Sequence, residues 1–174
     1  WLLAACVFLS GTFLRDFDQN VRDDVMNDLE KLQDQSPHAA AIGFVLTGTD
    51  GPACLFKMPY AEHLIGDPDT GVIHGGAITA ILDNACGWAV RNHPDWDSES
   101  SMATLDLRID YMEPAIPHLD VLVRSECFKL THNIAFVRGV AYQKDVNDPI
   151  ATSMATFMLG TPNTPREQEI RSSL

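Results

Sequence analysis

The chain has 174 residues, of which 45% are hydrophobic and 21% charged, the size and balance of one globular domain. Its formal net charge of -12 argues against nucleic acid and anionic membranes as partners, because binding to either rests on Lys and Arg. The four cysteines are scattered without a CxxC pair, which favours reduced thiols and a cytoplasmic location over a disulfide framework.

The first 37 residues read as an extension. Residues 1–14 carry no charge and are too short to span a bilayer as a helix; a signal remnant, an engineered addition and an extension packed on the domain all fit them. Apolar residues at three- and four-residue spacing predict an amphipathic helix over 18–35 that Ser36-Pro37 ends. We place the folded domain at 38–160 and a polar tail at 161–174.

The domain itself begins with a predicted hairpin. Residues 42–49 and 53–58 read as strands around a Gly51-Pro52 turn, and residues 59–71 as a loop or short helix. Residues 74–94 are apolar on almost every face, which predicts a buried helix that Pro94 ends. Four alternating runs follow, at 101–112, 118–130, 134–143 and 149–159, and predict an antiparallel meander. The order predicts an α+β fold, one helix wrapped by an antiparallel sheet.

Asp83 is the first candidate for chemistry, because it lies in the middle of the predicted buried helix. An ionised carboxylate in apolar surroundings is costly unless it is paired, and on the wall of an apolar cleft it can serve as a base or nucleophile. The alternative is a structural carboxylate that is solvated or satisfied by a nearby donor.

His74-Gly75-Gly76 is the second candidate, at the start of the same helix. Helix N-termini carry free N–H groups and a positive dipole end, so a substrate oxygen can approach closely at a glycine and find an oxyanion hole. A tight turn into the helix explains the two glycines equally well.

The spacing of these two candidates predicts a dimer. Gly75 and Asp83 are eight residues apart, or roughly 12 Å along a helix, too far to act together on one carbonyl. Two chains with antiparallel central helices can each supply what the other lacks. No GxSxG, GxGxxG or P-loop motif occurs, and no histidine pair has zinc-ligand spacing, so we predict neither metal nor cofactor.

Two sequence segments together resemble a known family. GVIHGGAITAILDNACG (71–87) and ATLDLRIDYMEPA (103–115) are similar to the PaaI-like, phenylacetate-pathway type of thioesterase within the hotdog-fold 4-hydroxybenzoyl-CoA thioesterase superfamily. The resemblance runs from about residue 39 to 160. It implies a hotdog fold, with sheets joined edge to edge in a homodimer and dimers often paired into homotetramers. It also implies an acyl-CoA substrate.

The resemblance further implies roles for single residues. Gly75, within the turn that His74 opens, polarises the thioester carbonyl; Asp83 activates water or attacks directly; Thr104 positions the water. Some family members use an Asn or Gln before the HGG turn, whereas the loop here holds only Asp67 and Asp69. Our catalytic candidates are therefore His74, Gly75, Asp83 and Thr104.

Substrate contacts are predicted along the helix and the sheet. The assigned residues are Gly76, Asn84, Trp88 for an acyl pocket, and Arg108 and Arg138 for the CoA phosphates. Two alternatives remain: a hotdog hydratase or dehydratase that uses His74, and a non-catalytic acyl-CoA-binding protein.

Overall fold

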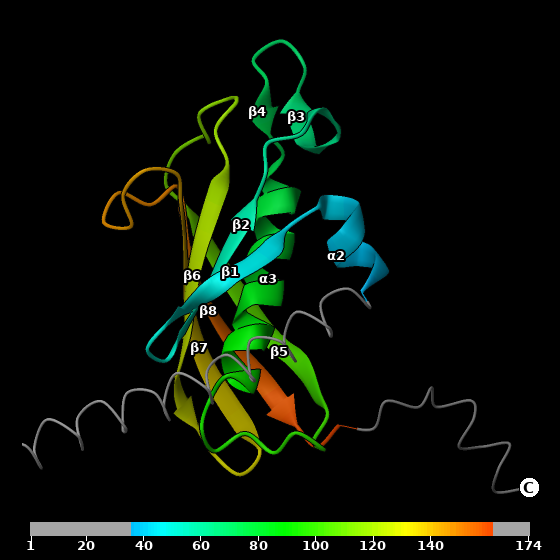
Figure 1. Cartoon of the computed structure of the whole chain (residues 1–174), viewed down its shortest axis with the longest axis vertical. Coiled ribbons are helices and arrows are strands. Elements are labelled where there is room, and N and C mark those ends of the chain that lie inside the picture. The colour runs from blue at the N-terminus through cyan, green and yellow to red at the C-terminus, as the bar shows by residue number, and fades with distance from the viewer. Residues whose placement is uncertain (1–35, 162–174) are drawn as a thin grey trace, which may run out of the picture. The chain divides into compact units, whose positions relative to one another are not determined.

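The computed structural model of the chain describes residues 36–161 (Figure 1). The predicted helix over 18–35, the uncharged residues 1–14 and the tail from 162 lie outside the described residues, so the domain limits at 37/38 and 160/161 stay predictions. Within the described part, no helix combines the length and apolarity that a membrane crossing requires.

The first described helix is α2 (Pro37–Ile42), at a point where we expected a helix to end. Proline is favoured at the first position of a helix, where its missing N–H costs nothing. The Ser36 hydroxyl accepts the Ala39 N–H at 3.4 Å in the manner of an N-cap. Ser36-Pro37 therefore begins a helix, and the predicted strand over 42–49 is shortened to β1 (Val45–Asp50).

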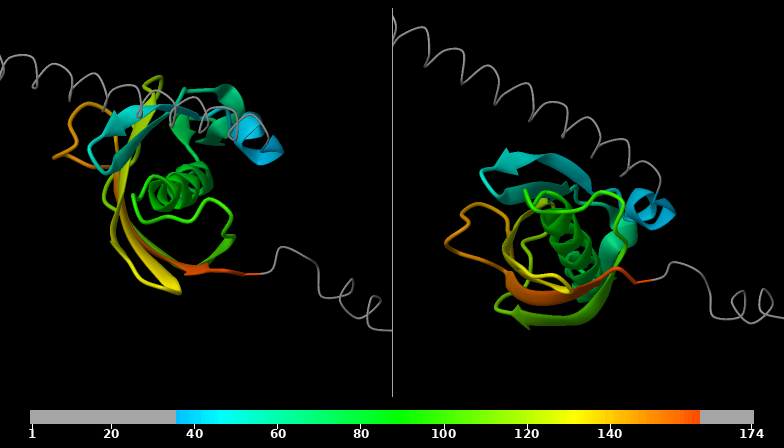
Figure 2. Two further views of the ribbon diagram at one scale, coloured as in Figure 1. Left: turned by 60° about the horizontal axis from the view of Figure 1, so that its bottom comes forward. Right: turned by 90° about the horizontal axis from the view of Figure 1, so that it is seen from below.

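A single sheet forms the frame of residues 42–161. It contains six antiparallel strands in the order β1-β2-β6-β7-β8-β5. The remaining strands of this sheet are β2 (Ala53–Met58), β5 (Met102–Tyr111), β6 (Val121–Leu130), β7 (Ile134–Tyr142) and β8 (Ala151–Leu159). Figure 2 shows the sheet curled around the long helix α3 (Gly75–Arg91). The predicted α+β fold, one helix wrapped by an antiparallel sheet, is confirmed.

The meander prediction is only partly right. Strands β6, β7 and β8 follow one another, but β5 pairs with β8 at the edge of the sheet and not with β6. The connection from β5 to β6 contains Pro114 and Pro117 and a positive φ of 64° at His118, so no tight hairpin turn brings β6 back beside β5. The edge position of β5 leaves one side of it without a strand partner.

The segment over 59–71, predicted as a loop or short helix, contains a short 3-10 helix and most of a small hairpin. A 3-10 turn (Glu62–Leu64) leads into β3 (Ile65–Asp67), which pairs with β4 (Val72–Ile73). The Asp67 carboxylate accepts bonds from the Thr70 hydroxyl at 2.8 Å and the Asp69 N–H at 3.1 Å, and these bonds lower the pKa of Asp67. Asp67 is thus engaged in its own turn.

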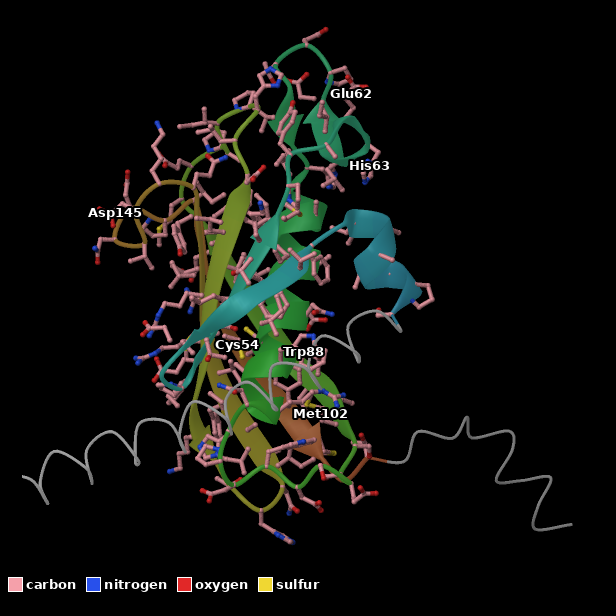
Figure 3. The ribbon with its side chains drawn as sticks, in the orientation of Figure 1. Cys54, Glu62, His63, Trp88, Met102 and Asp145 are labelled. Carbon is pink, nitrogen blue, oxygen red and sulfur yellow. The ribbon has the colours of Figure 1, made fainter. Side chains whose placement is uncertain are left out.

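Helix α3 is buried on the side that faces the sheet. Leu82 and Cys86 pack against β7, where a Cβ on Gly139 would lie only 3.2 Å from each of them. The buried Ser125 hydroxyl donates to the Ala85 carbonyl at 2.7 Å. Figure 3 labels Trp88 of α3 and Met102 of β5 in the lower part of this core. The expectation that α3 is buried all round holds for its C-terminal half only.

The other side of α3 carries a stripe of residues that are exposed or only half-buried. These residues are Gly76, Ala77, Ala80, Asp83 and Asn84. The spacing of three and four residues places them on one face of the helix, and three of the five are small. This stripe and the edge strand β5 are both open in the single chain.

Candidate active site

The turn that opens α3 is held by three hydrogen bonds. The His74 N–H donates to the Leu64 carbonyl at 2.8 Å, and the His74 carbonyl accepts the Ala77 N–H at 2.9 Å. The imidazole Nδ1 of His74 accepts the Gly76 N–H at 2.9 Å, so the side chain is the N-cap of the helix. Among the described residues, the Gly75 N–H is left without an acceptor at the positive end of the helix dipole.

The two glycines of the turn are required for different reasons. Neither has a positive φ, so backbone conformation does not demand glycine at either position. A Cβ on Gly76 would lie 2.8 Å from the His74 Nδ1 and displace the cap. A Cβ on Gly75 would meet only the Tyr111 ring, at an ordinary 3.4 Å. The fold therefore needs Gly76, whereas the absent side chain at Gly75 keeps its N–H open to a ligand.

Asp83, the predicted catalytic carboxylate, and Thr104, the residue predicted to position the water, are in direct contact. Thr104 of β5 donates its hydroxyl to Asp83 Oδ1 of α3 at 3.1 Å. Asp83 is half-buried and Thr104 exposed, so this carboxylate is less enclosed in the single chain than the apolar helix suggested. No second hydrogen bond to the Asp83 side chain occurs within residues 36–161, which leaves Oδ2 available.

A β-bulge turns Thr104 toward α3. Strand alternation alone would set Thr104 and Leu107 on opposite faces of β5. The register with β8 shifts between Thr104, which pairs with the buried Phe157, and Asp106, which pairs with Thr156. The extra residue, Leu105, lets Thr104 and Leu107 face the same side, a common effect of bulges near functional sites.

A pocket of about 360 Å³ lies beside the start of the helix. Its lining includes Gly75 and Ile78 of α3, Ile73 of β4, Tyr111 of β5 and Ala115. Most of these side chains are apolar, so the pocket can hold an apolar group next to the free Gly75 N–H. The sequence analysis did not predict this pocket, because it forms between two stretches that are far apart in the sequence, residues 72–78 and 111–115.

Asn84 lies one residue after Asp83 on the open stripe of α3. Its Oδ1 is buried and is the one buried side-chain nitrogen or oxygen atom of the described residues without a hydrogen-bond partner. Such an atom carries the full cost of lost hydration, about 1–3 kcal/mol. Exchange of the amide O and N would not remove the problem, since the buried atom would still lack a partner.

The remaining predicted substrate residues are not brought together with Asp83 or Gly75. Trp88 is buried, with 8% of its surface exposed, and lies beneath the Arg91 guanidinium. Arg108 and Arg138 both flank Met154 of β8 in the strand register, on the face of the sheet turned away from α3. Each is paired with a carboxylate at 3.0 Å, Arg108 with Asp110 and Arg138 with Glu126.

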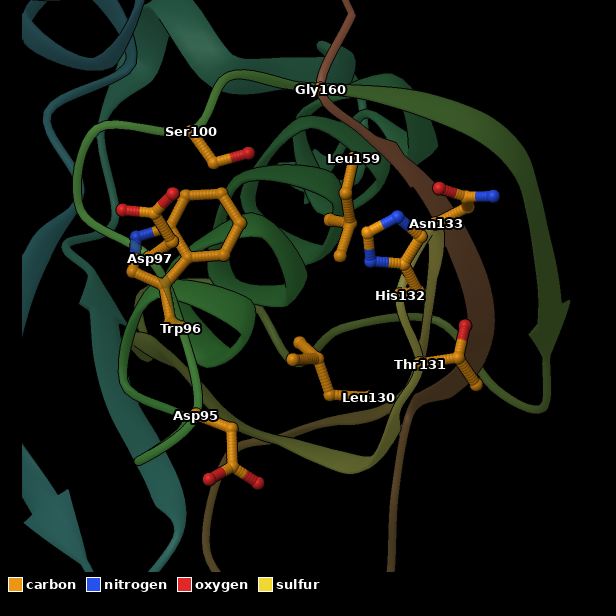
Figure 4. Close-up of a pocket in the computed structure, with 10 residues that line it drawn as sticks. All are labelled: Asp95, Trp96, Asp97, Ser100, Leu130, Thr131, His132, Asn133, Leu159 and Gly160. Atoms are coloured by element: carbon orange, nitrogen blue, oxygen red, sulfur yellow. The ribbon is translucent and has the colours of Figure 1, made fainter.

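A second and larger pocket, of about 600 Å³, lies past the C-terminal end of α3 (Figure 4). Trp96, Leu130 and Leu159 contribute apolar side chains to its wall, which is otherwise mostly polar and includes Asp95 and Asp97. Neither Asp83 nor Gly75 lines it. This pocket therefore does not belong to the candidate active site.

Two residues of the site were not predicted. The Tyr111 hydroxyl lies 2.7 Å from the Gly75 carbonyl oxygen and 2.6 Å from the Thr79 hydroxyl, which lies 3.0 Å from the same carbonyl oxygen. The two hydroxyl protons can serve two of these three contacts at a time. Tyr111 was recognised only as an apolar position of β5. Its place at the last residue of the strand, just before a proline-rich connection, was the available signal.

The fold and the site together define a class of protein. In this class an antiparallel sheet wraps one helix, and that helix carries a carboxylate in its middle and a free N–H at its N-terminus. A family model described as Thioesterase superfamily (4HBT) matches residues 70–150. A Pseudomonas aeruginosa protein of known crystal structure is 39% identical, with 76% of this chain and 97% of that chain covered and a TM-score of 0.67. The chain belongs to the thioesterase superfamily, as predicted.

Two further matches complete the comparison. The rat acyl-coenzyme A thioesterase THEM4 is 34% identical over 113 residues, which are 64% of this chain and 44% of THEM4. The chain spans less than half the length of the curated relatives that it matches. The phenylacetic acid degradation protein PaaI of Thermus thermophilus matches with a TM-score of 0.60 at 20% identity, over 71% of this chain and 98% of PaaI. That likeness is one of fold.

Proposed function

We propose that this chain is an acyl-CoA thioesterase, which hydrolyses the thioester of a small or medium acyl-CoA to the free acid and CoA. The observation that carries the proposal is the Asp83 carboxylate, held by the Thr104 hydroxyl at 3.1 Å on the open side of α3. The free Gly75 N–H beside an apolar pocket supplies the second element that acyl transfer needs.

Each group has a distinct task in this mechanism. The Gly75 N–H donates to the thioester carbonyl oxygen and stabilises the negative charge that develops there. Asp83 either removes a proton from the attacking water or attacks the carbonyl itself. Thr104 fixes Oδ1 and so aims Oδ2 at the reacting carbon. A thioester is already activated, so the reaction needs no metal ion.

The working form in this proposal is a homodimer with two shared sites, which can pair into a tetramer. Three features support it: the strand β5 is a sheet edge, the open stripe of α3 is rich in small residues, and the buried Asn84 Oδ1 has no partner within residues 36–161. Exposed edge strands are normally covered, and buried polar atoms are normally hydrogen-bonded. A two-fold axis beside β5 would bring the Gly75 of one chain toward the Asp83 of the other.

The shared site is tested by mixing variants. Asp83→Asn and Gly75→Ala chains, each inactive alone, should recover activity after joint refolding, because a heterodimer contains one site with both groups intact. Refolded mixtures that form dimers and stay inactive would exclude a site shared between chains.

Substrate class is tested by following the free thiol released from a panel of aliphatic and aromatic acyl-CoAs. Wild-type protein should release CoA from at least one of them, and Asp83→Asn protein should not. Crotonyl-CoA tests the hydratase alternative: hydration without thiol release would favour that reaction. The His74 Nδ1 is already engaged with the Gly76 N–H, so only the Nε2 of this ring could serve in a hydratase reaction.

The CoA phosphates remain assigned to Arg108 and Arg138 as a prediction. Both arginines are paired with carboxylates in the single chain, so the nucleotide would have to compete with these pairs. Replacing either arginine by Gln should raise KM for a CoA thioester but not for a pantetheine thioester, and added salt should narrow the difference between the two substrates. If the variant and the wild type have equal KM values for the CoA thioester at low salt, these arginines do not bind the CoA phosphates.

We also propose a cytoplasmic location. The thiols of Cys54, Cys86 and Cys127 are free and buried, as is usual for proteins of reducing compartments. A mass measurement of the protein from its native cells, before and after alkylation, would test this: disulfide-linked cysteines would contradict it.

A further inference from the structure

We propose that Tyr111 and Thr79 are positioning residues for the oxyanion donor, acting through the Gly75 carbonyl; the inference rests on the proposed thioesterase function. Tyr111 stands at the end of β5, and Thr79 lies one turn after Gly75 on α3. Their two hydroxyl groups and the Gly75 carbonyl form a triangle of oxygen atoms with sides of 2.6, 2.7 and 3.0 Å.

This triangle completes the support of both peptide groups that flank Gly75. The group between His74 and Gly75 is fixed through its carbonyl, which accepts the Ala77 N–H. The group between Gly75 and Gly76 is fixed at its N–H by the His74 ring and at its carbonyl by the two hydroxyls. The direction of the remaining free N–H, that of Gly75, is therefore set before any substrate binds.

The position of Tyr111 indicates a role beyond folding. In the single chain its side chain is exposed, with 52% of the residue surface accessible, so its ring contributes little buried apolar surface to the core of that chain. A hydrogen bond in such a position adds little to stability, because water competes for both partners. Its ring nevertheless lies against Gly75 and forms part of the pocket wall. The contact between Tyr111 and Gly75 therefore lies where it can orient the Gly75 N–H toward a bound substrate.

The test is the substitution Tyr111→Phe, which removes the hydroxyl and keeps the ring. We expect kcat to fall about 5- to 30-fold, the effect of a single lost hydrogen bond on an aligned donor, while KM changes less than about 2-fold and the melting temperature stays close to that of the wild type. The matched control is Tyr60→Phe, since the Tyr60 hydroxyl also donates to a glycine carbonyl, Gly71, at 2.8 Å. That variant should keep its kcat.

Thr79 provides the second arm of the experiment. Thr79→Val removes the hydroxyl at constant shape and should lower kcat, and Thr79→Ser should restore it. Combined Tyr111→Phe and Thr79→Val substitutions should cost less than the product of the single effects, since both act on one carbonyl.

A readout without substrate separates this inference from the proposed function. Loss of the Tyr111 hydroxyl should shift the amide nitrogen resonance of Gly76, because its peptide group contains the Gly75 carbonyl; the Tyr60→Phe control should leave it unchanged. An active wild type with unchanged kcat in Tyr111→Phe would overturn the positioning role. Inactive wild-type protein with the shifted Gly76 resonance would instead refute the thioesterase proposal and leave the hydrogen-bonded support of the turn standing.

Discussion

The two ends of helix α3 each adjoin a pocket but differ in the chemical groups that they present to it. At the N-terminal end the Gly75 N–H is free, an apolar pocket of about 360 Å³ adjoins it, and hydroxyl groups fix the turn. At the C-terminal end the last turn is closed, because the Asn92 N–H bonds to the Trp88 carbonyl at 2.9 Å and the His93 N–H to the Val90 carbonyl at 3.1 Å. The pocket beyond it is larger, about 600 Å³.

The larger pocket is the weaker candidate. It contains carboxylates and one histidine, but no free donor at a helix start and no carboxylate held by a hydroxyl as Asp83 is. Substitutions around the start and middle of α3 should therefore change turnover, whereas substitutions beyond its C-terminal end should affect stability alone. The experiments below are ordered by the size of the effect expected from this difference.

Asp83→Asn should have the largest effect. The Asn side chain keeps the acceptor for the Thr104 hydroxyl but loses the charge, so turnover should fall about 10²- to 10⁴-fold. Removal of a half-buried charge should leave the melting temperature unchanged or raise it. Asp97→Asn, in the wall of the other pocket, is the control and should keep full turnover. Wild-type turnover in the Asp83→Asn protein would overturn the mechanism.

Gly75→Ala keeps the backbone N–H, but its methyl group hinders the approach of the carbonyl oxygen. Turnover should therefore fall, by up to the roughly 10²- to 10³-fold that a lost oxyanion donor usually costs. The new methyl group has room in the folded chain, where its nearest contact is 3.4 Å, so stability should hold or rise with the better helix propensity of Ala. Gly76→Ala should instead reduce stability more than it reduces turnover. Its methyl group would lie 2.8 Å from the His74 ring, so the cap is lost and the melting temperature falls. Equal loss of stability in both variants would contradict the separate roles of the two glycines.

Thr104→Ala should reduce turnover about 10-fold, since orientation of the carboxylate is a smaller contribution than its charge. Thr104 is exposed in the single chain, so the free energy of unfolding should change by less than about 1 kcal/mol. Thr156→Ala, on the opposite face of the sheet, is the control. A Thr104→Ala enzyme with full turnover would mean that Asp83 needs no support from β5.

Deletion of Leu105 should have the smallest effect. Thr104 and Asp106 pair with Phe157 and Thr156, which are neighbours on β8, so the shortened strand can keep both pairings and leave Thr104 facing α3. Turnover should stay within about 3-fold of the wild type, because the deletion removes the bulge but leaves the Thr104 side chain on the face of β5 that is turned toward α3. A loss larger than that of Thr104→Ala would show that the bulge itself shapes the site.

Much of the fold was predictable because its signals are local. Strand β2 has the predicted bounds, 53–58, and α3 begins one residue after the predicted start. The hairpin β3–β4 was missed because its strands are three and two residues long, too short to show a period. The edge position of β5 was also missed, since alternation shows which face a residue occupies but not which strand lies beside it.

The site was predictable to the extent that it is contained in motifs. The HGG turn, Asp83 and Thr104 each stand in a recognisable segment, and the structure brings Asp83 and Thr104 into contact. The bulge at Leu105 could not be predicted, because the run 101–112 alternates regularly in sequence. Tyr111, Thr79 and the pocket depend on the packing of β5 against the start of α3, which only the folded chain determines.

The buried cysteines have a practical consequence for measuring the proposed activity. Burial raises the pKa of Cys54 and of Cys86 to about 12, and it also raises the pKa of Cys127. At pH 8 a thiol with a pKa near 12 is ionised in only about one molecule in 10⁴, and the thiolate is the form that attacks a disulfide reagent. The thiols of the folded core should therefore be silent toward such a reagent in the native state. Once the reaction of Cys6, which lies outside the described residues, is subtracted in a control without substrate, a rising signal in the presence of acyl-CoA reports released CoA.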